Sequence, residues 1–187
     1  MNFYFISDDR WFLEGLQKIP LKLYGQVLFI HTNDFAKMPL PNAGDVVVIN
    51  VADIALRQKF LHLPVMSACR VIILLNISII IKCSLGREFP WLYPDNAKVE
   101  NLISCLHLAA KTPIVYKDIR QQEKWYFQYL NSGESHKELA ARMGLSEKSL
   151  YALKRRVMAS YGLSKCHCTA VMVCRDITGM HQYTLSA

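Results

Sequence analysis

Four cations stand close together in the stretch "SEKSLYALKRRVMASYG", residues 146 to 162. They fall within nine residues, at Lys148, Lys154, Arg155 and Arg156. The apolar residues of this stretch recur at helical spacing, which leaves the cations on the exposed side of a helix. Such a helix fits the major groove of DNA, which is about 12 Å wide, and its cations could neutralise phosphates or contact base edges. The alternative is a basic amphipathic helix that only packs on its own domain.

A second candidate position lies at the end of a buried strand. The run "VVVI", residues 46 to 49, is followed by Asn50. Ligands of open parallel sheets bind beyond the carboxyl ends of the strands, so the chain places an amide at that edge. The histidines His31, His62, His107 and His136 have no partners at catalytic spacing, and no phosphate-binding glycine loop occurs. We therefore do not expect an enzyme.

The C-terminal cysteines invite comparison with a zinc site. Cys166 and Cys168 are followed by Cys174 and His181. Two thiols spaced Cys-x-Cys on a helix point about 200° apart, and Cys174 falls on an apolar face, so this spacing does not suit zinc. We expect no metal and no cofactor. The six cysteines are expected to be reduced thiols.

The first part of the chain alternates short apolar runs with longer amphipathic ones. This rhythm predicts βαβ units and an α/β domain with five parallel strands over residues 1 to 112. Strands are expected at 3–7, 26–32, 45–50, 69–76 and 90–93, and helices at 10–19, 52–63 and 97–110.

After Pro113 the pattern becomes purely helical. We predict a linker over residues 113 to 118 and a domain of four helices over residues 119 to 187. The expected helices are 118–133, with Trp125, Tyr126, Tyr129 and Leu130 at helical spacing, then 135–144, 146–162 and 167–177. Ser135 and Ser146 are N-caps, Glu138 completes a capping box, and Gly144 and Gly162 end helices.

The second and third of these helices form a helix-turn-helix pattern. Their predicted shared core is Leu139, Ala140, Met143, Leu145, Leu150 and Leu153. The segment "HKELAARMGLSEKSLYALKRRVMASYGLS" resembles the helix-turn-helix of LuxR/FixJ-type transcription regulators. Lys137, Glu138, Ala140, Ser146 and Val157 agree with the family pattern, whereas Ser149 replaces Thr, Leu153 replaces His and Ser160 replaces Lys.

This resemblance implies roles for individual residues. The expected base-contacting residues are Tyr151, Ala152 and Arg155, the expected phosphate contacts are Lys148, Ser149, Lys154 and Arg156, and the expected dimerisation residues are Val171, Met172 and Cys174.

The first domain resembles the receiver domain, a flavodoxin-like fold, that often precedes such a helix-turn-helix. "ISDDRWFLEGL" matches a receiver's first strand, acidic pair and first helix. At the position of the phosphoacceptor carboxylate stands Asn50, and Asn76 and Tyr93 replace two further switch residues. An amide cannot serve as that nucleophile, so we expect a receiver-like domain without phosphotransfer. Asp8 and Asp9 are expected to cap the following helix rather than to hold Mg²⁺.

These expectations describe a transcription regulator that binds double-stranded DNA as a homodimer or with another LuxR-type regulator, similar to the RcsA/BglJ subgroup. The alternative is an interaction adaptor that modulates a partner regulator and binds DNA weakly. No motif for a cyclic dinucleotide precedes the helix-turn-helix.

Charge and hydropathy agree with a polyanionic partner. The net charge is +7, and residues 113 to 187 hold 11 Lys/Arg against 6 Asp/Glu, compared with 11 against 9 in residues 1 to 112. The longest apolar run, residues 71 to 81, is too short to span a bilayer, and the N-terminus does not resemble a signal peptide. We expect a cytoplasmic protein without a membrane segment.

Overall fold

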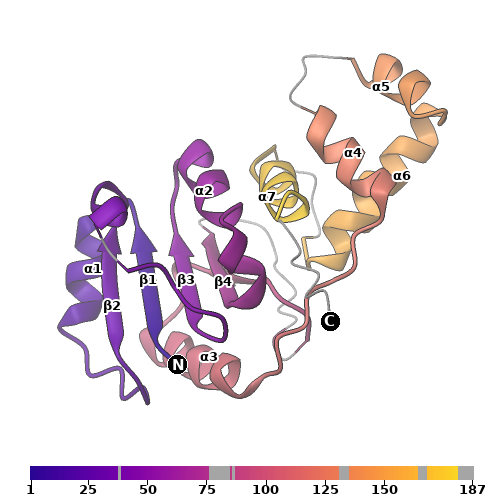
Figure 1. The fold of residues 1–187 in the computed structure, drawn as a ribbon. Coiled ribbons are helices and arrows are strands. Elements are labelled where there is room, and N and C mark those ends of the chain that lie inside the picture. Colours follow the sequence, from indigo (N-terminus) through magenta and orange to yellow (C-terminus); the bar gives the residue numbers. More distant parts are fainter. Residues whose placement is uncertain (38, 76–84, 86, 131–134, 164–167, 181–187) are drawn as a thin grey trace. The chain divides into compact units, whose positions relative to one another are not determined.

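The structure is a computed structural model of the 187-residue chain, and it describes residues 1–37, 39–75, 85, 87–130, 135–163 and 168–180. Contacts divide the chain into two compact units. The described residues of the first unit run from Met1 to Lys117, with Met180, and those of the second run from Asp118 to Gly179 (Figure 1). No helix among the described residues is long and apolar enough to cross a membrane.

The first unit is built on a five-stranded parallel sheet, which confirms the predicted strand count and direction. The strand order is β2-β1-β3-β4-β5, the flavodoxin-like order of doubly wound sheets. The strands are β1 (Phe3–Ser7), β2 (Val27–His31), β3 (Val46–Asn50), β4 (Arg70–Leu75) and β5 (Trp91–Pro94).

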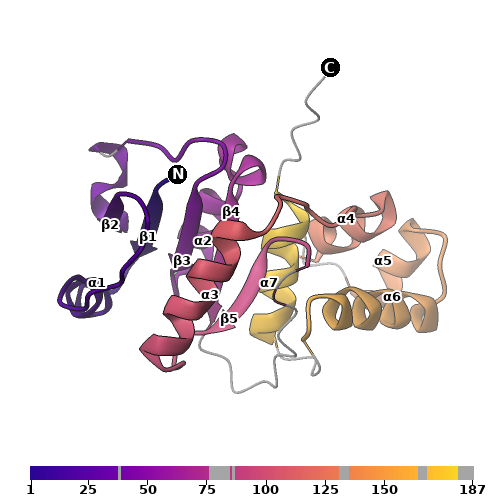
Figure 2. The ribbon, with the colours of Figure 1, turned by 90° about the horizontal axis from the view of Figure 1, so that it is seen from below.

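Helices connect these strands. They are α1 (Arg10–Gln17), α2 (Ile54–Leu61) and α3 (Val99–Lys111), with 3-10 helices η1 (Thr32–Lys37) and η2 (Pro64–Ala68). Figure 2 shows α1 and α3 along the same side of the sheet, and their buried leucines join one apolar core with alternate strand residues. That core includes Phe3, Phe5, Val48, Leu74 and Trp91 from the strands and Leu13, Leu16, Leu102 and Leu106 from the helices.

The residues between these on each strand are buried as well. Examples are Tyr4, Ile6, Val47, Ile49 and Ile73. Burial of both faces explains why the strands are continuous apolar runs rather than alternating ones, as in other parallel sheets. At the carboxyl edge of the sheet, β1 ends with Ser7 and β3 ends with Asn50.

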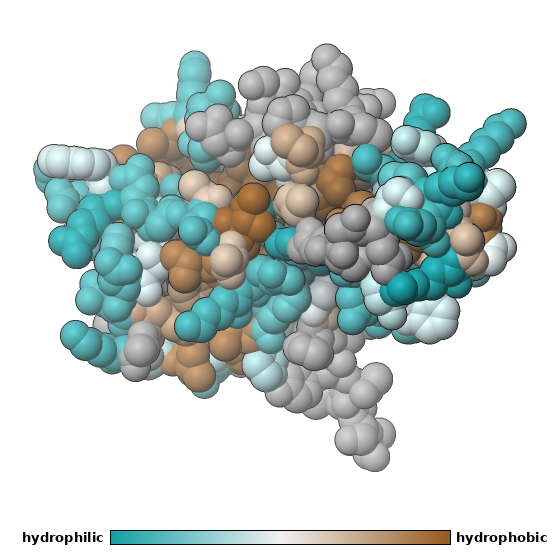
Figure 3. Space-filling view, turned by 90° about the horizontal axis from the view of Figure 1, so that it is seen from above, coloured by the Kyte–Doolittle hydropathy of each residue, from teal (hydrophilic) through white to brown (hydrophobic). Residues whose placement is uncertain are grey.

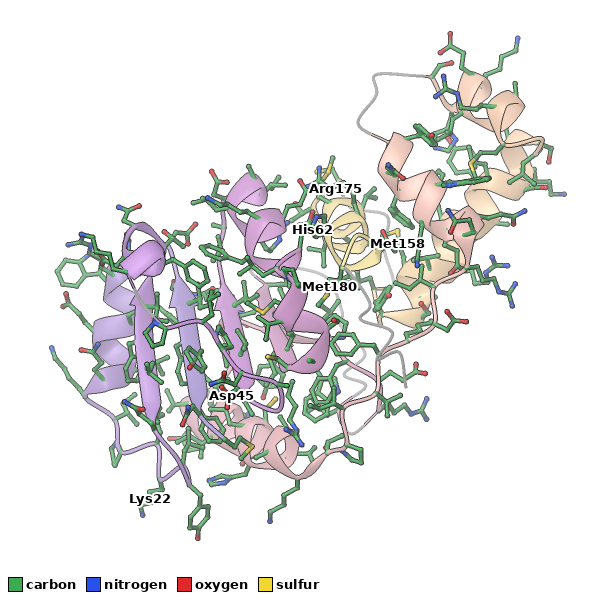
Figure 4. The ribbon with its side chains drawn as sticks, viewed as in Figure 1. Lys22, Asp45, His62, Met158, Arg175 and Met180 are labelled. Carbon is green, nitrogen blue, oxygen red and sulfur yellow. The ribbon has the colours of Figure 1, made fainter. Side chains whose placement is uncertain are left out.

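A buried carboxylate fixes the opposite, amino end of the sheet. Asp45 lies immediately before β3 (Figure 4) and accepts hydrogen bonds from the backbone N–H of Asn2 at 2.7 Å and of Asn42 at 2.9 Å. A buried charge costs free energy unless it is hydrogen-bonded. The bond from Asn2 joins segments far apart in sequence, whereas the bond from Asn42 closes the loop directly before β3. Asp45 therefore holds the start of β1 and the loop before β3 together.

The predicted linker is attached to the first unit. The Phe89 N–H donates to the Val115 carbonyl at 2.7 Å, and the Tyr116 hydroxyl lies 2.7 Å from the Met66 carbonyl and 2.8 Å from the Cys69 carbonyl. Burial raises the pKa of Tyr116 well above its ordinary value, so the hydroxyl remains a hydrogen-bond donor. The chain up to Tyr116 therefore belongs to the sheet domain, and the free part of the connection is shorter than residues 113 to 118.

Replacing this hydroxyl should loosen the connection. We expect Tyr116→Phe to lower the free energy of unfolding by about 1 kcal/mol, because two carbonyls lose a buried donor while the ring remains. A urea unfolding titration monitored by circular dichroism measures this change in the free energy of unfolding. The control is Tyr24→Phe, whose side chain is largely exposed and should leave stability unchanged. Equal stability of Tyr116→Phe and the wild type would show that the hydroxyl anchors nothing.

The described part of the second unit is helical. It contains α4 (Gln121–Tyr129), α5 (His136–Arg142), α6 (Glu147–Ser160) and α7 (Cys168–Thr178). Helix α4 begins later than predicted, because Arg120 is an extended N-cap whose backbone N–H donates to Glu123 at 3.1 Å. The predicted stop at Gly133 lies outside the described residues. Tyr126 and Phe127 are fully buried, whereas Trp125 is 46% exposed.

Helix α7 contacts both α4 and α6. Its Arg175 guanidinium donates to the Asp176 carboxylate at 2.6 Å and 3.0 Å, and both residues are buried (Arg175 is labelled in Figure 4). Of the residues expected at a dimer surface, Val171 and Cys174 are buried within the single chain and Met172 is half-buried. Their part in dimerisation stays a prediction.

Candidate nucleic-acid interface

The start of α5 is fixed by the predicted capping box. The Ser135 Oγ accepts from the Glu138 N–H at 3.2 Å, and the Glu138 Oε2 accepts from the Ser135 N–H at 2.8 Å. The Ser135 hydroxyl also donates to the Glu138 Oε2 at 2.8 Å, and the hydrogen bonds that this carboxylate accepts from the Ser135 N–H and hydroxyl lower the pKa of Glu138. The reciprocal pair satisfies two helix-terminal donors and sets where α5 begins.

A tight turn then joins α5 to α6. Gly144 has φ +63°, in the left-handed region that favours glycine, and the Leu145 N–H donates back to the Ala140 carbonyl at 2.9 Å. Ser146 follows directly as the N-cap of α6, where its Oγ accepts from the Ser149 N–H at 3.1 Å. The end of one helix and the start of the next are thus specified within four residues.

The buried sides of α5 and α6 agree with the predicted core. Leu139 and Ala140 of α5 and Leu150 and Leu153 of α6 are buried, while Met143 and Leu145, also predicted there, are half-buried. Contacts join α5 to α6 and α6 to α4. Leu153, which departs from the resembled family's usual His, therefore contributes to the core rather than to the surface.

The opposite side of α6 presents the candidate contact residues. Lys148, Tyr151, Ala152 and Arg155 are all exposed, and their spacing of three, four and seven residues places them on one stripe of the helix. We call these four residues the α6 stripe. In Figure 3, the part of the second unit at the right of the view carries mostly hydrophilic side chains, coloured teal.

The two adjacent arginines of α6 differ in their surroundings. Within the part of the chain that the structure describes, Arg155 makes no hydrogen bond or ion pair. Arg156 donates from its guanidinium to the Glu123 carboxylate of α4 at 3.3 Å, with side chains that are 55% and 11% exposed. Arg155 is thus free for a ligand, whereas Arg156 also compensates a nearly buried charge.

The other two expected phosphate contacts, Ser149 and Lys154, are less available than Lys148. The Ser149 Oγ lies 2.8 Å from the Ser146 Oγ, which makes Ser149 part of the helix cap. Lys154 is half-buried. Among the four cations of α6, Lys148 and Arg155 are therefore the most available for a ligand.

An interaction that sequence reasoning missed supports Tyr151. Tyr151 is 51% exposed, and its ring stacks on the His136 ring, with 4.5 Å between centroids and 12° between planes. His136 follows the Ser135 cap directly, and no interaction partner for it could be predicted from the sequence. Only the crossing of α5 and α6 brings the two rings together, and the sequence carries no signal for it beyond two ring side chains on paired helices.

The carboxyl edge of the sheet holds the second candidate position. In the β1–β3 register Ser7 pairs with Asn50, and the Asn50 Nδ2 donates to the Ser7 Oγ at 3.4 Å. Tyr93 is buried in β5, and Asn76 lies outside the described residues. The side chain at the end of β3 is therefore the Asn50 amide, which is hydrogen-bonded to the Ser7 hydroxyl of the neighbouring strand β1.

The two acids near this edge have different roles. Asp9 caps α1 as predicted, accepting from the Trp11 N–H at 2.8 Å and the Phe12 N–H at 3.3 Å. The same expectation for Asp8 is wrong. Asp8 accepts instead from the N–H groups of Ala52 at 2.9 Å and Asp53 at 3.0 Å, because the parallel pairing of β1 and β3 brings the loops after them together.

The metal and zinc candidates gain no support from the geometry. Among the described residues, no group of three His, Cys, Asp or Glu side chains could hold a metal ion. Cys166 and His181 lie outside the described residues, Cys168 is exposed and Cys174 is buried.

Solved structures of response regulators are similar to this chain at low sequence identity. No protein-family model and no curated protein sequence matches the chain. A structure of RcsB from Salmonella enterica serovar Typhimurium bound to the promoter P1flhDC is similar at 14% identity, covering 95% of this chain and 98% of that one, with a TM-score of 0.47. A structure of two RcsB dimers bound to two parallel DNAs is 14% identical, with 93% and 97% coverage and a TM-score of 0.42.

A further similar structure is the response regulator ChrA of a heme-sensing two-component system. It is 16% identical, with 92% and 94% coverage and a TM-score of 0.36.

Proposed function

We propose that this protein is a sequence-specific DNA-binding transcription regulator. The observation that carries the proposal is the α6 stripe: Lys148, Tyr151, Ala152 and Arg155 are exposed on one side of a helix whose other side is buried. A capped helix, a tight turn and a second capped helix hold that stripe outward, as a recognition helix requires. Tyr151, Ala152 and Arg155 contact base edges, and Lys148, Ser149, Lys154 and Arg156 contact phosphates.

The domain assignment follows from the same proposal. Residues 1 to 112 form a receiver-like domain, and residues 119 to 187 form a LuxR-type DNA-binding domain. Residues 113 to 118 connect the two, with the part up to Tyr116 hydrogen-bonded to the sheet domain. The protein acts in the cytoplasm, and it binds DNA as a homodimer or with another LuxR-type regulator. Of the expected dimer residues Val171, Met172 and Cys174, we propose Met172 for the contact, because the other two are buried within the single chain.

The receiver-like domain works without phosphorylation. Asn50 offers an amide where an acyl phosphate needs a carboxylate. Asp8 is hydrogen-bonded to two backbone N–H groups, so a cation at this edge would have to compete with bonds of 2.9 and 3.0 Å. The loop after β3 is therefore held by a side chain of the protein itself rather than by a phosphoryl group.

Incubation with acetyl phosphate and Mg²⁺ should leave the intact mass of the protein unchanged. The physical reason is the missing carboxylate at Asn50, and intact-mass spectrometry measures the outcome directly. A receiver that retains its phosphoacceptor serves as the positive control under the same conditions. A stable gain of one phosphoryl group would refute phosphorylation independence.

The experiment that tests DNA binding is a salt titration of duplex affinity. For the wild type, log K should fall linearly with log salt, because bound cations release counterions from DNA. Lys148→Ala should weaken binding to every sequence alike and reduce the slope by about one per bound copy. Fluorescence anisotropy at about 50 to 200 mM salt measures both quantities.

The matched control for this titration is Lys59→Ala, which removes an exposed lysine from α2 in the other unit. An unchanged slope in Lys148→Ala would contradict the assigned phosphate contact. Absence of any salt-dependent duplex binding by the wild type would favour an interaction adaptor that acts through a partner regulator.

A further inference from the structure

Three ring side chains from three helices meet beside the α6 stripe. His136 of α5 lies between Tyr126 of α4 and Tyr151 of α6. Its ring is nearly parallel to Tyr151, at 4.5 Å and 12°, and its centroid is 6.1 Å from that of Tyr126, with planes tilted by 62°. Both distances fall in the range of favourable stacked and edge-to-face aromatic pairs.

Hydrogen bonding fixes the orientation of the imidazole. The His136 Nε2 lies 3.5 Å from the Tyr126 hydroxyl, and the buried Nδ1 has no hydrogen-bond partner among the described residues. A buried donor without a partner costs more than a buried acceptor, so we assign the hydrogen to Nε2, from which it can donate to Tyr126. Tyr126 is fully buried and so provides a rigid support.

The stack has a consequence for Tyr151. One face of its ring is covered by His136, while half of the side chain is exposed. The tyrosine can therefore offer its hydroxyl and its ring edge to a ligand, but not both faces of its ring. An exposed side chain held in this way loses less conformational entropy on binding than a free one.

We propose that His136 is a positioning residue for DNA recognition. By stacking on the Tyr151 ring it restricts that ring to one orientation on α6, in which the hydroxyl and ring edge contact the base edges. This inference rests on the proposed function, because it assigns to Tyr151 a contact with bases. His136 itself touches no DNA in this account, since Tyr151 covers it on one side and Tyr126 adjoins it on another.

The test is a double-mutant cycle on the full-length protein. The measured quantity is the ratio of affinities for a duplex enriched from a random pool and for a scrambled duplex. His136→Gln should lower this ratio by about threefold to tenfold, and His136→Phe, which restores a stacking ring, should stay within about twofold of the wild type. In a Tyr151→Ala background, His136→Gln should have no further effect.

A second readout does not depend on DNA. In the free protein, the ring protons of Tyr151 should be shifted upfield by the stacked imidazole, and His136→Gln should move them toward the values of an unstacked tyrosine. Thermal unfolding of each variant identifies any loss that comes from unfolding, and His136→Phe keeps the ring volume if the glutamine variant proves unstable.

The outcomes separate this inference from the proposed function. If the wild type does not discriminate between duplexes, both fail. If the wild type discriminates and Tyr151→Ala reduces the ratio, but His136→Gln does not, or reduces it equally with and without Tyr151, the positioning role alone is overturned. Loss of the upfield shift together with loss of discrimination, both restored by His136→Phe, supports it.

Discussion

Replacing Arg155 with alanine should weaken binding to the specific operator by about 1 to 3 kcal/mol more than binding to a scrambled duplex. Arg155 is exposed on the α6 stripe and, within the described residues, makes no intramolecular hydrogen bond or ion pair. A guanidinium in this position can bind guanine through two hydrogen bonds, which the wrong base cannot accept. Anisotropy titrations with both duplexes at one salt concentration measure the difference.

Stability should be almost unaffected by this change, because the side chain is exposed and forms no hydrogen bond or ion pair among the described residues. The control is Lys148→Ala, which should weaken both duplexes by the same factor. If Arg155→Ala also weakened both duplexes equally, Arg155 would be a phosphate contact, and its assigned contact with base edges would be wrong.

The neighbouring Arg156→Ala should instead lower the free energy of unfolding by about 1 to 2 kcal/mol. The Glu123 carboxylate is 11% exposed and accepts from the Arg156 guanidinium at 3.3 Å. Removing Arg156 leaves the nearly buried Glu123 charge uncompensated, but Arg156 is 55% exposed, so water reduces the cost below that of a fully buried pair. Urea unfolding measures the loss.

A double-mutant cycle isolates this pair. Glu123→Gln retains a carbonyl oxygen that can accept from the Arg120 N–H, so the start of α4 is preserved while the charge is removed. In that background Arg156→Ala should cost little. If Arg156→Ala lowered the free energy of unfolding equally in both backgrounds, Arg156 would stabilise α6 by other contacts, and its pairing with Glu123 would contribute nothing.

The sequence predicted the fold of the first unit well because its signals are local. Apolar runs bounded by polar residues located all five strands, and their alternation with amphipathic segments implied parallel pairing. The partners of Asp8 could not be predicted, because its hydrogen bonds to Ala52 and Asp53 depend on the register of β1 against β3.

In the second unit, the spacing around Trp125 predicted a helix but did not show that Tyr126 and Phe127, rather than Trp125, face the core.

In the candidate interface too, local features could be predicted from the sequence, whereas contacts between helices could not. Caps and turns depend on neighbouring residues, so Ser135, Gly144 and Ser146 could be assigned from their types and spacing. The roles of His136 and Glu123 depend on which helices cross and on which side chains meet there. Both supply contacts between helices that lie apart in sequence, and these contacts distinguish Tyr151 and Arg156 from their neighbours on α6.

The most direct test of sequence-specific recognition by the α6 stripe is selection from a random DNA pool with purified full-length protein, at about 50 and 200 mM salt. We expect enrichment of a motif with two half-sites that persists at the higher salt, and its loss in Arg155→Ala. Recovery of salt-sensitive background alone, with no motif from the wild type, would contradict the account.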